Sequence, residues 1–148
     1  MTKWNAEAYS DAQGKNNITR NARQYRDLDL FFLKKGTTKD IRTVTDVLAI
    51  KRSVKHLVLT NIYEKPFHPE IGSGVRDLLF ENMTPLTSII LTKKVEDVIV
   101  NFEPRVRLTG VQAPPNLDLN TYELTIEFFI LNAPTELQTV DMFLERLR

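Results

Sequence analysis

The segment Asn101-Phe102-Glu103-Pro104-Arg105 places a carboxylate and a guanidinium on either side of a proline, directly after a long apolar stretch. Glu103 could act as a catalytic acid, as one half of an ion pair, or as part of a surface for a protein partner. A general acid in glycoside hydrolysis needs a raised pKa and a second carboxylate about 5–10 Å away. A neighbouring cation instead lowers the pKa of a carboxylate, and no other acidic pair has a cleft-forming context. We therefore predict no catalytic residue.

Few side chains could hold a metal ion or form a covalent intermediate. The chain has no cysteine, and its two histidines are His56 and His68. Disulfides, thiol nucleophiles and thiolate metal sites are therefore excluded. We expect His56 on the flank of a helix and His68 in a rigid loop, and we predict no metal site and no cofactor.

Charge and hydropathy argue against two further classes of function. The 148 residues include 20 Lys and Arg against 19 Asp and Glu, and the basic residues occur in pairs such as Lys34-Lys35 rather than in dense runs. Because nucleic-acid binding through phosphates usually needs a basic patch, we predict no nucleic-acid partner. Neither a run of about 18 apolar residues nor a signal-peptide segment is evident. We expect no membrane association and synthesis in a cytoplasm.

Hydrophobic periodicity predicts the helix that leads to Glu103. Thr84 offers a capping oxygen and Pro85 suits the first helical position. Pro104 disfavours helical angles at Glu103, so the helix should end there. The expected inner face repeats at three- and four-residue steps and consists of Leu91, Val95, Val98 and Phe102, widened by Leu86, Ile90 and Ile99.

A second helix is expected from Asp46, acting as its cap, to about Leu59. Its wet face would carry Lys51, Arg52 and Lys55, and its inner face Val47, Ile50, Val54, Leu57 and Val58. Residues 61–74 contain two prolines and two glycines and should form an ordered loop, followed by one or two helical turns over residues 75–81.

Alternating hydrophobicity predicts strands over residues 28–32, 106–113 and 121–131. The first strand would direct Leu28, Leu30 and Phe32 to one face, opposite Asp29 and Phe31. The C-terminal segment fits both a helix and a strand, with the helix slightly favoured by pattern alone. We divide the chain into an extended N-terminal arm, residues 1–26, and one domain, residues 27–148.

Three segments resemble a known family in order and spacing: KPFHPEIG at residues 65–72, LFENMTPLT at residues 79–87 and NFEPR at residues 101–105. From about Asp40 to the C-terminus the chain resembles the baseplate wedge subunits of contractile phage tails. This group has also been called lysozyme-like, and it has a relative in type VI secretion baseplates. The N-terminal arm lies outside the resemblance.

The resemblance implies an α+β fold in which helices pack on a small antiparallel sheet, similar to the inner domain of tail sheath proteins. It implies a strand rather than a helix over residues 139–147. It also implies a structural, non-enzymatic subunit of the virion tail baseplate, made in the host cytoplasm and present in six copies around the tail tube. The alternatives are a cell-wall hydrolase and the equivalent subunit of a type VI secretion or tailocin baseplate.

The resemblance also implies partners. For the Glu103 motif, the residues alone favour either an intramolecular ion pair at the helix exit or an interface, with Pro104 holding both charged side chains in a fixed splay. The family implies contact with the helical core bundle of other wedge subunits through Asn101, Phe102, Glu103, Pro104 and Arg105.

A second partner, the tail sheath, would add strands to the edge of the sheet. The pairing strands carry Tyr122, Leu124, Ile126, Val140, Met142 and Leu144. The charges on these strands could limit wrong pairing or simply form a solvated face. The central hub or tube is a further candidate partner.

Overall fold

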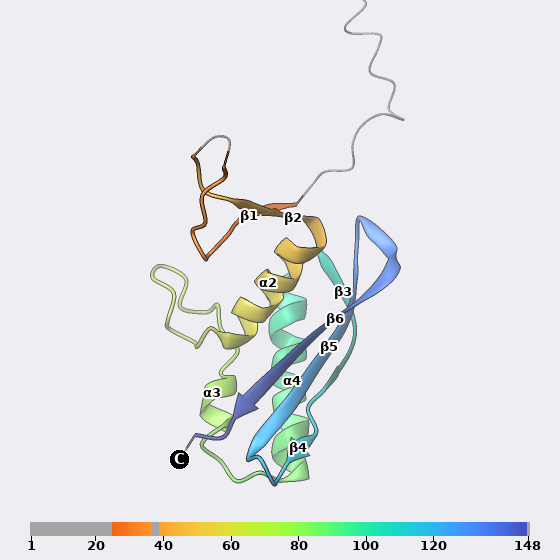
Figure 1. The fold of residues 1–148 in the computed structure, drawn as a ribbon. Helices are drawn as coiled ribbons and strands as arrows, with labels where there is room; N and C mark the ends of the chain where they lie inside the picture. Colours follow the sequence, from red (N-terminus) through yellow and green to blue (C-terminus); the bar gives the residue numbers. More distant parts are fainter. Residues whose placement is uncertain (1–24, 37–38, 148) are drawn as a thin grey trace, which may run out of the picture.

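Helices and one antiparallel sheet form the body of the protein, as an α+β fold requires (Figure 1). The computed structural model describes residues 25–36 and 39–147. The elements, in chain order, are β1 (Arg26–Leu28), β2 (Thr43–Thr45), α2 (Asp46–Leu59), α3 (Val75–Leu78), α4 (Pro85–Phe102), β3 (Val106–Gln112), β4 (Pro115–Asn116), β5 (Thr121–Ile130) and β6 (Ala133–Glu145).

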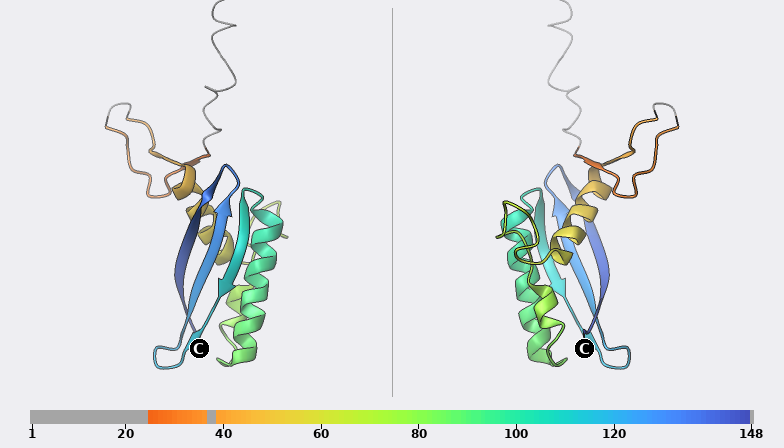
Figure 2. Two further views of the ribbon diagram at one scale, coloured as in Figure 1. Left: turned by 90° about the vertical axis from the view of Figure 1, so that its right-hand side faces the viewer. Right: turned by 90° about the vertical axis from the view of Figure 1, so that its left-hand side faces the viewer.

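The sheet is built around β5. Strand β6 pairs with β5 on one side, and β3 and β4 pair with it on the other, all antiparallel. The helices cover one face of the sheet, and the other face is open (Figure 2). The predicted alternation in β5 is confirmed, because the side chains that face the helices are all buried: Tyr122, Leu124, Ile126, Phe128 and Ile130.

Helix α4 has the predicted ends. The Thr84 hydroxyl accepts a hydrogen bond from the Thr87 amide at 3.1 Å, and Pro85 occupies the first turn. The inner face through Leu91, Val95, Val98 and Ile99 is confirmed. The predicted widening was right at Ile99 but wrong at Leu86 and Ile90, which are exposed, and Phe102 of the predicted face is only half-buried.

Helix α2 starts and ends close to the expected positions. Its cap is Thr45 rather than Asp46, and the cap side chain makes no hydrogen bond. Ile50, Val54 and Val58 are buried as predicted. Residues 61–74 form a loop without regular structure, and α3 supplies one turn whose Val75 and Leu78 face the core. This loop and α3 connect α2 to α4 (Figure 1).

The strand predicted over residues 28–32 was wrong. Strand β1 ends at Leu28, and the chain turns at Leu30 and Phe31. The physical reason is Asp29, whose buried carboxylate accepts hydrogen bonds from Arg52 and from the Phe31 amide, so the backbone closes into a turn. Alternation alone contained no sign of this tertiary contact.

The predicted N-terminal arm falls almost entirely outside the described residues, which begin at Tyr25. Two of its residues contact the domain: Arg26 pairs with Thr45, and the Tyr25 carbonyl accepts from the Asp46 amide at 2.7 Å. The arm over residues 1–24 stays a prediction.

The C-terminal segment is a strand, as the family resemblance implied and the pattern alone did not. It begins at Ala133, earlier than the expected Thr139, and only Leu131 and Asn132 separate it from β5. Val140, Met142 and Leu144 are buried against the helices. Among the described residues, no helix is long and apolar enough to span a membrane.

Candidate functional site

Glu103 lies at the C-terminal cap of α4, where its amide still donates to the Ile99 carbonyl at 2.9 Å. Its side chain is only 3% exposed. One carboxylate oxygen accepts from Arg105 Nε, and the other accepts from Arg105 Nη2 at 2.6 Å and from Ser53 Oγ at 2.6 Å. Because Ser53 belongs to α2, this carboxylate joins the two long helices.

Arg105 faces Glu103 across Pro104 and makes a two-point ion pair with it. The expected splay of the two side chains was therefore wrong, and the intramolecular ion pair is the arrangement found. The guanidinium carbon also lies 5.5 Å from the centre of the Tyr25 ring, a cation–π distance. The Arg105 carbonyl accepts from the Leu131 amide at 3.0 Å, so the same residue reaches the end of β5.

The environment decides the protonation state of this pair. Burial acts to raise the pKa of Glu103, but the hydrogen bonds from Arg105 and Ser53 outweigh burial, and the pKa lies below its usual value. The hydrogen bond to Glu103 raises the pKa of Arg105. Glu103 is thus held ionised at neutral pH, which is the wrong state for a general acid.

The other residues of the predicted site differ in their exposure. Asn101 and Pro104 are exposed, Arg105 keeps 29% of its side chain accessible, and Phe102 is half-buried. Phe102 lines a groove of about 280 Å³ that lies between the hairpin formed by β1 and β2, helix α2 and the loop after α2. The groove is also lined by Asp27, Leu30, Ser53, His56, Leu57, Thr60, Lys65 and Ile71.

The predicted sheath-pairing residues occupy the two longest strands. Strand β5 is paired on both sides, so its main chain is already used within the sheet. Among the described strands, β6 pairs only with β5 and has a free outer edge. Of these two strands, only β6 therefore has a free edge to which a strand of another protein could be added.

Residues 45–135 match the family described as baseplate wedge protein gp25. This match covers more than half of the chain and includes Ser53, Glu103 and Arg105. The chain belongs to the gp25 family of baseplate wedge proteins. It is therefore a component of the tail baseplate, where it assembles with other wedge subunits.

A relative in Enterobacteria phage T4, named baseplate wedge protein gp25, is 32% identical over 118 residues, which cover 80% of this chain and 89% of that protein. Solved structures share the fold. A candidate tail lysozyme from Geobacter sulfurreducens has a TM-score of 0.62 at 21% identity, over 67% of this chain and 89% of that one.

Two baseplates contain similar chains. In the anti-feeding prophage baseplate the TM-score is 0.58 at 19% identity, over 84% of this chain and 88% of that one. In the baseplate of the contracted pyocin R2 the TM-score is 0.56 at 17% identity, over 72% and 98%. At these identities the likeness concerns the fold.

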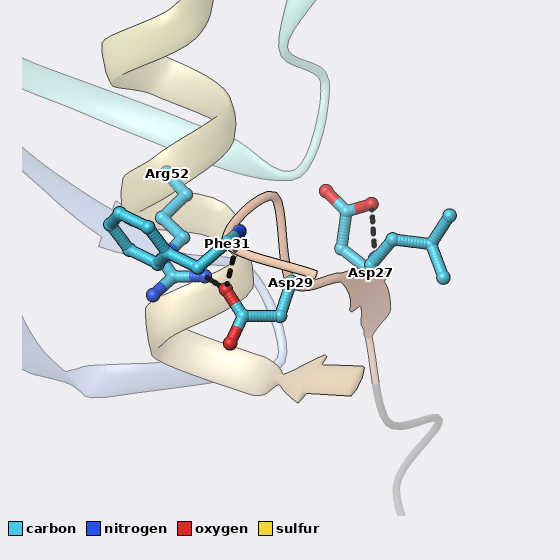
Figure 3. Close-up of polar contacts among 5 residues, drawn as sticks. Asp27, Asp29, Phe31 and Arg52 are labelled. Atoms are coloured by element: carbon cyan, nitrogen blue, oxygen red, sulfur yellow. Dashed lines mark hydrogen bonds and ion pairs between the residues drawn. The ribbon is translucent and has the colours of Figure 1, made fainter. Parts of the chain in front are cut away.

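This wedge protein has a second ion pair that the sequence did not predict (Figure 3). Asp29 and Arg52 approach to 2.6 Å, and the Arg52 guanidinium lies 5.3 Å from the centre of the Phe31 ring. The hydrogen bond from Arg52 holds the pKa of Asp29 below its usual value. A lone Asp within an apolar run, LDLFFL, was the one available signal for this contact.

Neither histidine takes part in the Glu103–Arg105 ion pair or in the Asp29–Arg52 ion pair. His68 Nδ1 lies 3.1 Å from a Glu70 oxygen on the exposed loop, and His56 is exposed on α2 beside the groove. Within the described part of the chain, no three His, Cys, Asp or Glu side chains are grouped as metal ligands would be.

Proposed function

We propose that this wedge protein is a structural, non-enzymatic subunit that joins the core of the wedge through the surface around Glu103 and Arg105. The observation that carries this proposal is the saturated, buried Glu103 carboxylate beside an Arg105 that is still partly accessible. A buried pair of this kind is costly to break. It fixes the guanidinium beside exposed Pro104, so this part of the surface is rigid before a partner binds.

The partner of this surface is the helical core bundle formed by other wedge subunits. A partner carboxylate or carbonyl oxygen would reach the accessible edge of Arg105, and an apolar side chain would enter the groove beside Phe102. Charges that become desolvated at an interface contribute strongly when paired and cost several kcal/mol when one partner is removed.

The test is co-purification of variants with the other wedge subunits after co-expression. Asn101→Arg adds a bulky cation to the exposed last turn of α4 and should abolish wedge assembly while the domain stays folded. Arg105→Ala should also abolish assembly. Ile89→Arg is the matched control, because it adds the same cation to an exposed position near the other end of α4, outside the groove. Normal co-purification of both Asn101→Arg and Arg105→Ala would refute the proposal.

The second role we propose is to start the sheath. The outer edge of β6 would accept a strand from the first sheath ring by β-augmentation, in a domain similar to the inner domain of the sheath protein. One residue beyond β6, the Arg146 amide donates to the Asn120 carbonyl at 2.9 Å. Because donors alternate along a strand, the amides of Thr139, Asp141 and Phe143 should then point to the free edge.

A cell-wall hydrolase is the alternative, favoured by the name of the Geobacter sulfurreducens relative. Incubation of the purified protein with peptidoglycan separates the two functions. Turnover that disappears in Glu103→Gln would overturn the structural proposal, whereas an inert protein supports it. The lowered pKa of Glu103 and its buried position favour an inert protein.

A further inference from the structure

The turn after β1 carries the longest run of exposed apolar side chains in the described chain. We call Leu30-Phe31-Phe32-Leu33 the hairpin tip. Phe31 is 75% exposed and Phe32 is 64% exposed, and both leucines are more than half exposed. The hairpin protrudes at one end of the molecule, beyond the start of α2 (Figure 1). Single exposed apolar residues are ordinary, but a contiguous set marks an interaction surface.

The hairpin tip is held in place by its neighbours. Asp29 is fixed by Arg52, and the Phe32 amide donates to the Asp29 carbonyl at 2.8 Å. On the other side, the Arg42 amide donates to the Leu33 carbonyl at 2.7 Å. Phe32 has a φ of 52°, a left-handed conformation that aromatic residues rarely adopt. Strain of this kind tends to occur at functional sites.

The hairpin and the two longest strands carry net charges of opposite sign. Residues 26–45 contain five Lys and Arg and three Asp, and one of these, Asp29, is already paired with Arg52. Strands β5 and β6 contain five Asp and Glu and no Lys or Arg. The hairpin is therefore basic, and the two strands are acidic.

The acidic surface is the part of the open sheet face formed by β5 and β6. It carries two exposed apolar side chains, which are separated along β6 by Thr139 and Asp141. Phe143, on the edge strand β6, is 74% exposed and lies opposite Glu123, while Leu137 is 47% exposed and lies opposite Phe129. We define the outer sheet face by the β5 and β6 residues that point away from the helices: Glu123, Thr125, Glu127, Phe129, Leu137, Thr139, Asp141, Phe143 and Glu145. Neighbouring like charges repel one another across a sheet, and a cationic partner would relieve this repulsion.

We propose that the hairpin tip of one copy docks on the outer sheet face of a second copy. Phe31 and Phe32 would pack against Phe143, with Leu137 at the rim of the contact, and the basic residues of the hairpin would lie among the carboxylates. The contact is heterologous, because each copy offers one surface of each kind, and repetition closes a ring or extends a chain. The family match begins at residue 45, after the hairpin tip.

The contact uses the face of the sheet and leaves its edge free. Strand addition at β6 requires main-chain donors and acceptors, whereas the hairpin tip would contact side chains. A small contact of this kind is weak between free molecules. It becomes effective when several copies are held on one assembly, because the local concentration rises.

Two complementary variants test the proposal. Phe31→Ser/Phe32→Ser removes the tip and keeps the sheet face, and Leu137→Ser/Phe143→Ser removes the sheet face and keeps the tip. At up to about 1 mM, where contacts with a Kd of about 1 mM still form, the wild type should self-associate in sedimentation equilibrium. Each variant alone should lose at least about tenfold in association constant, as expected for aromatic anchors. A mixture should form a 1:1 complex that grows no further.

Tyr63→Ser/Phe67→Ser is the matched control, since it removes two exposed aromatic side chains from the loop after α2. It should associate like the wild type. Raising the salt concentration from about 0.1 M to about 1 M shortens the screening length from about 10 Å to about 3 Å. The attraction between the basic hairpin and the acidic strands should then weaken. A wild type that stays monomeric over the whole concentration range overturns the proposal. So does self-association of either double variant at the wild-type level, or a mixture that stays monomeric.

Discussion

Glu103 shows how one buried carboxylate can hold several segments together, and its pH dependence follows from its partners. Its pKa is lowered in the folded state, so its contribution to stability is complete above the unfolded value of about 4.3 and is lost as the pH falls towards the folded value. Glu103→Gln should lower the free energy of unfolding at pH 7 by about 1.5–3 kcal/mol. In urea titrations, the difference from wild type should shrink as the pH falls from about 5.

An exposed ion pair supplies the control for this measurement. Glu96 lies 3.6 Å from Lys93 on the surface of α4. Glu96→Gln should change the free energy of unfolding by less than about 1 kcal/mol, because water and salt screen such pairs. A Glu103→Gln effect that stays constant from pH 7 down to about pH 3 would mean that the carboxylate is not held ionised by Arg105 and Ser53.

At the scale of elements, the loop between α2 and α3 depends on one close backbone approach. A Cβ on Gly72 would lie 2.5 Å from the Asn61 carbonyl carbon and from the Ile62 amide nitrogen. Gly72→Ala should therefore lower the free energy of unfolding by about 1–3 kcal/mol, as overpacking does. Gly36→Ala, where a Cβ meets nothing within 4 Å, should change it by less than about 0.5 kcal/mol. Thermal and urea unfolding of both variants would check this, and equal effects would contradict it.

The elements also show what a sequence can predict. The ends of α4 were predicted because Thr84, Pro85 and Pro104 act on the backbone next to them. Strand β6 was not predictable from pattern, because its apolar spacing fits two structures and pairing with β5 decides between them. Local alternation likewise failed at Asp29, whose partner is 23 positions away in the sequence.

The candidate site was predicted only in part, for the same reason. The Glu103–Arg105 pair was foreseeable from two residues that flank a proline. Its third member, Ser53, lies 50 positions earlier and carries no signal of its own. The groove beside Phe102 is formed by segments that meet only in the folded chain. Local chemistry thus predicted the pair, and tertiary packing supplied its surroundings.

Across the whole molecule, two of the proposed surfaces meet. Glu103 and Arg105 lie at the end of α4, and Leu30 of the hairpin tip lines the same groove as Phe102. Strand β6 forms an edge of the sheet. All three depend on one core, which includes Val140, Met142 and Leu144 from β6. Deleting β6 to test sheath assembly would therefore remove part of that core, and a single substitution is the better experiment.

Thr139→Pro is that substitution. Thr139 is exposed, and its amide is expected to point to the free edge, so proline there removes a donor for an incoming strand without breaking a bond to β5. Baseplates assembled with Thr139→Pro should form normally but start few or no sheaths in electron micrographs, whereas Thr139→Ser, which keeps the amide, should start them at the wild-type level. The melting temperatures of both variants should be similar. Sheath growth at the wild-type level on Thr139→Pro baseplates would show that this edge of β6 does not receive the sheath strand.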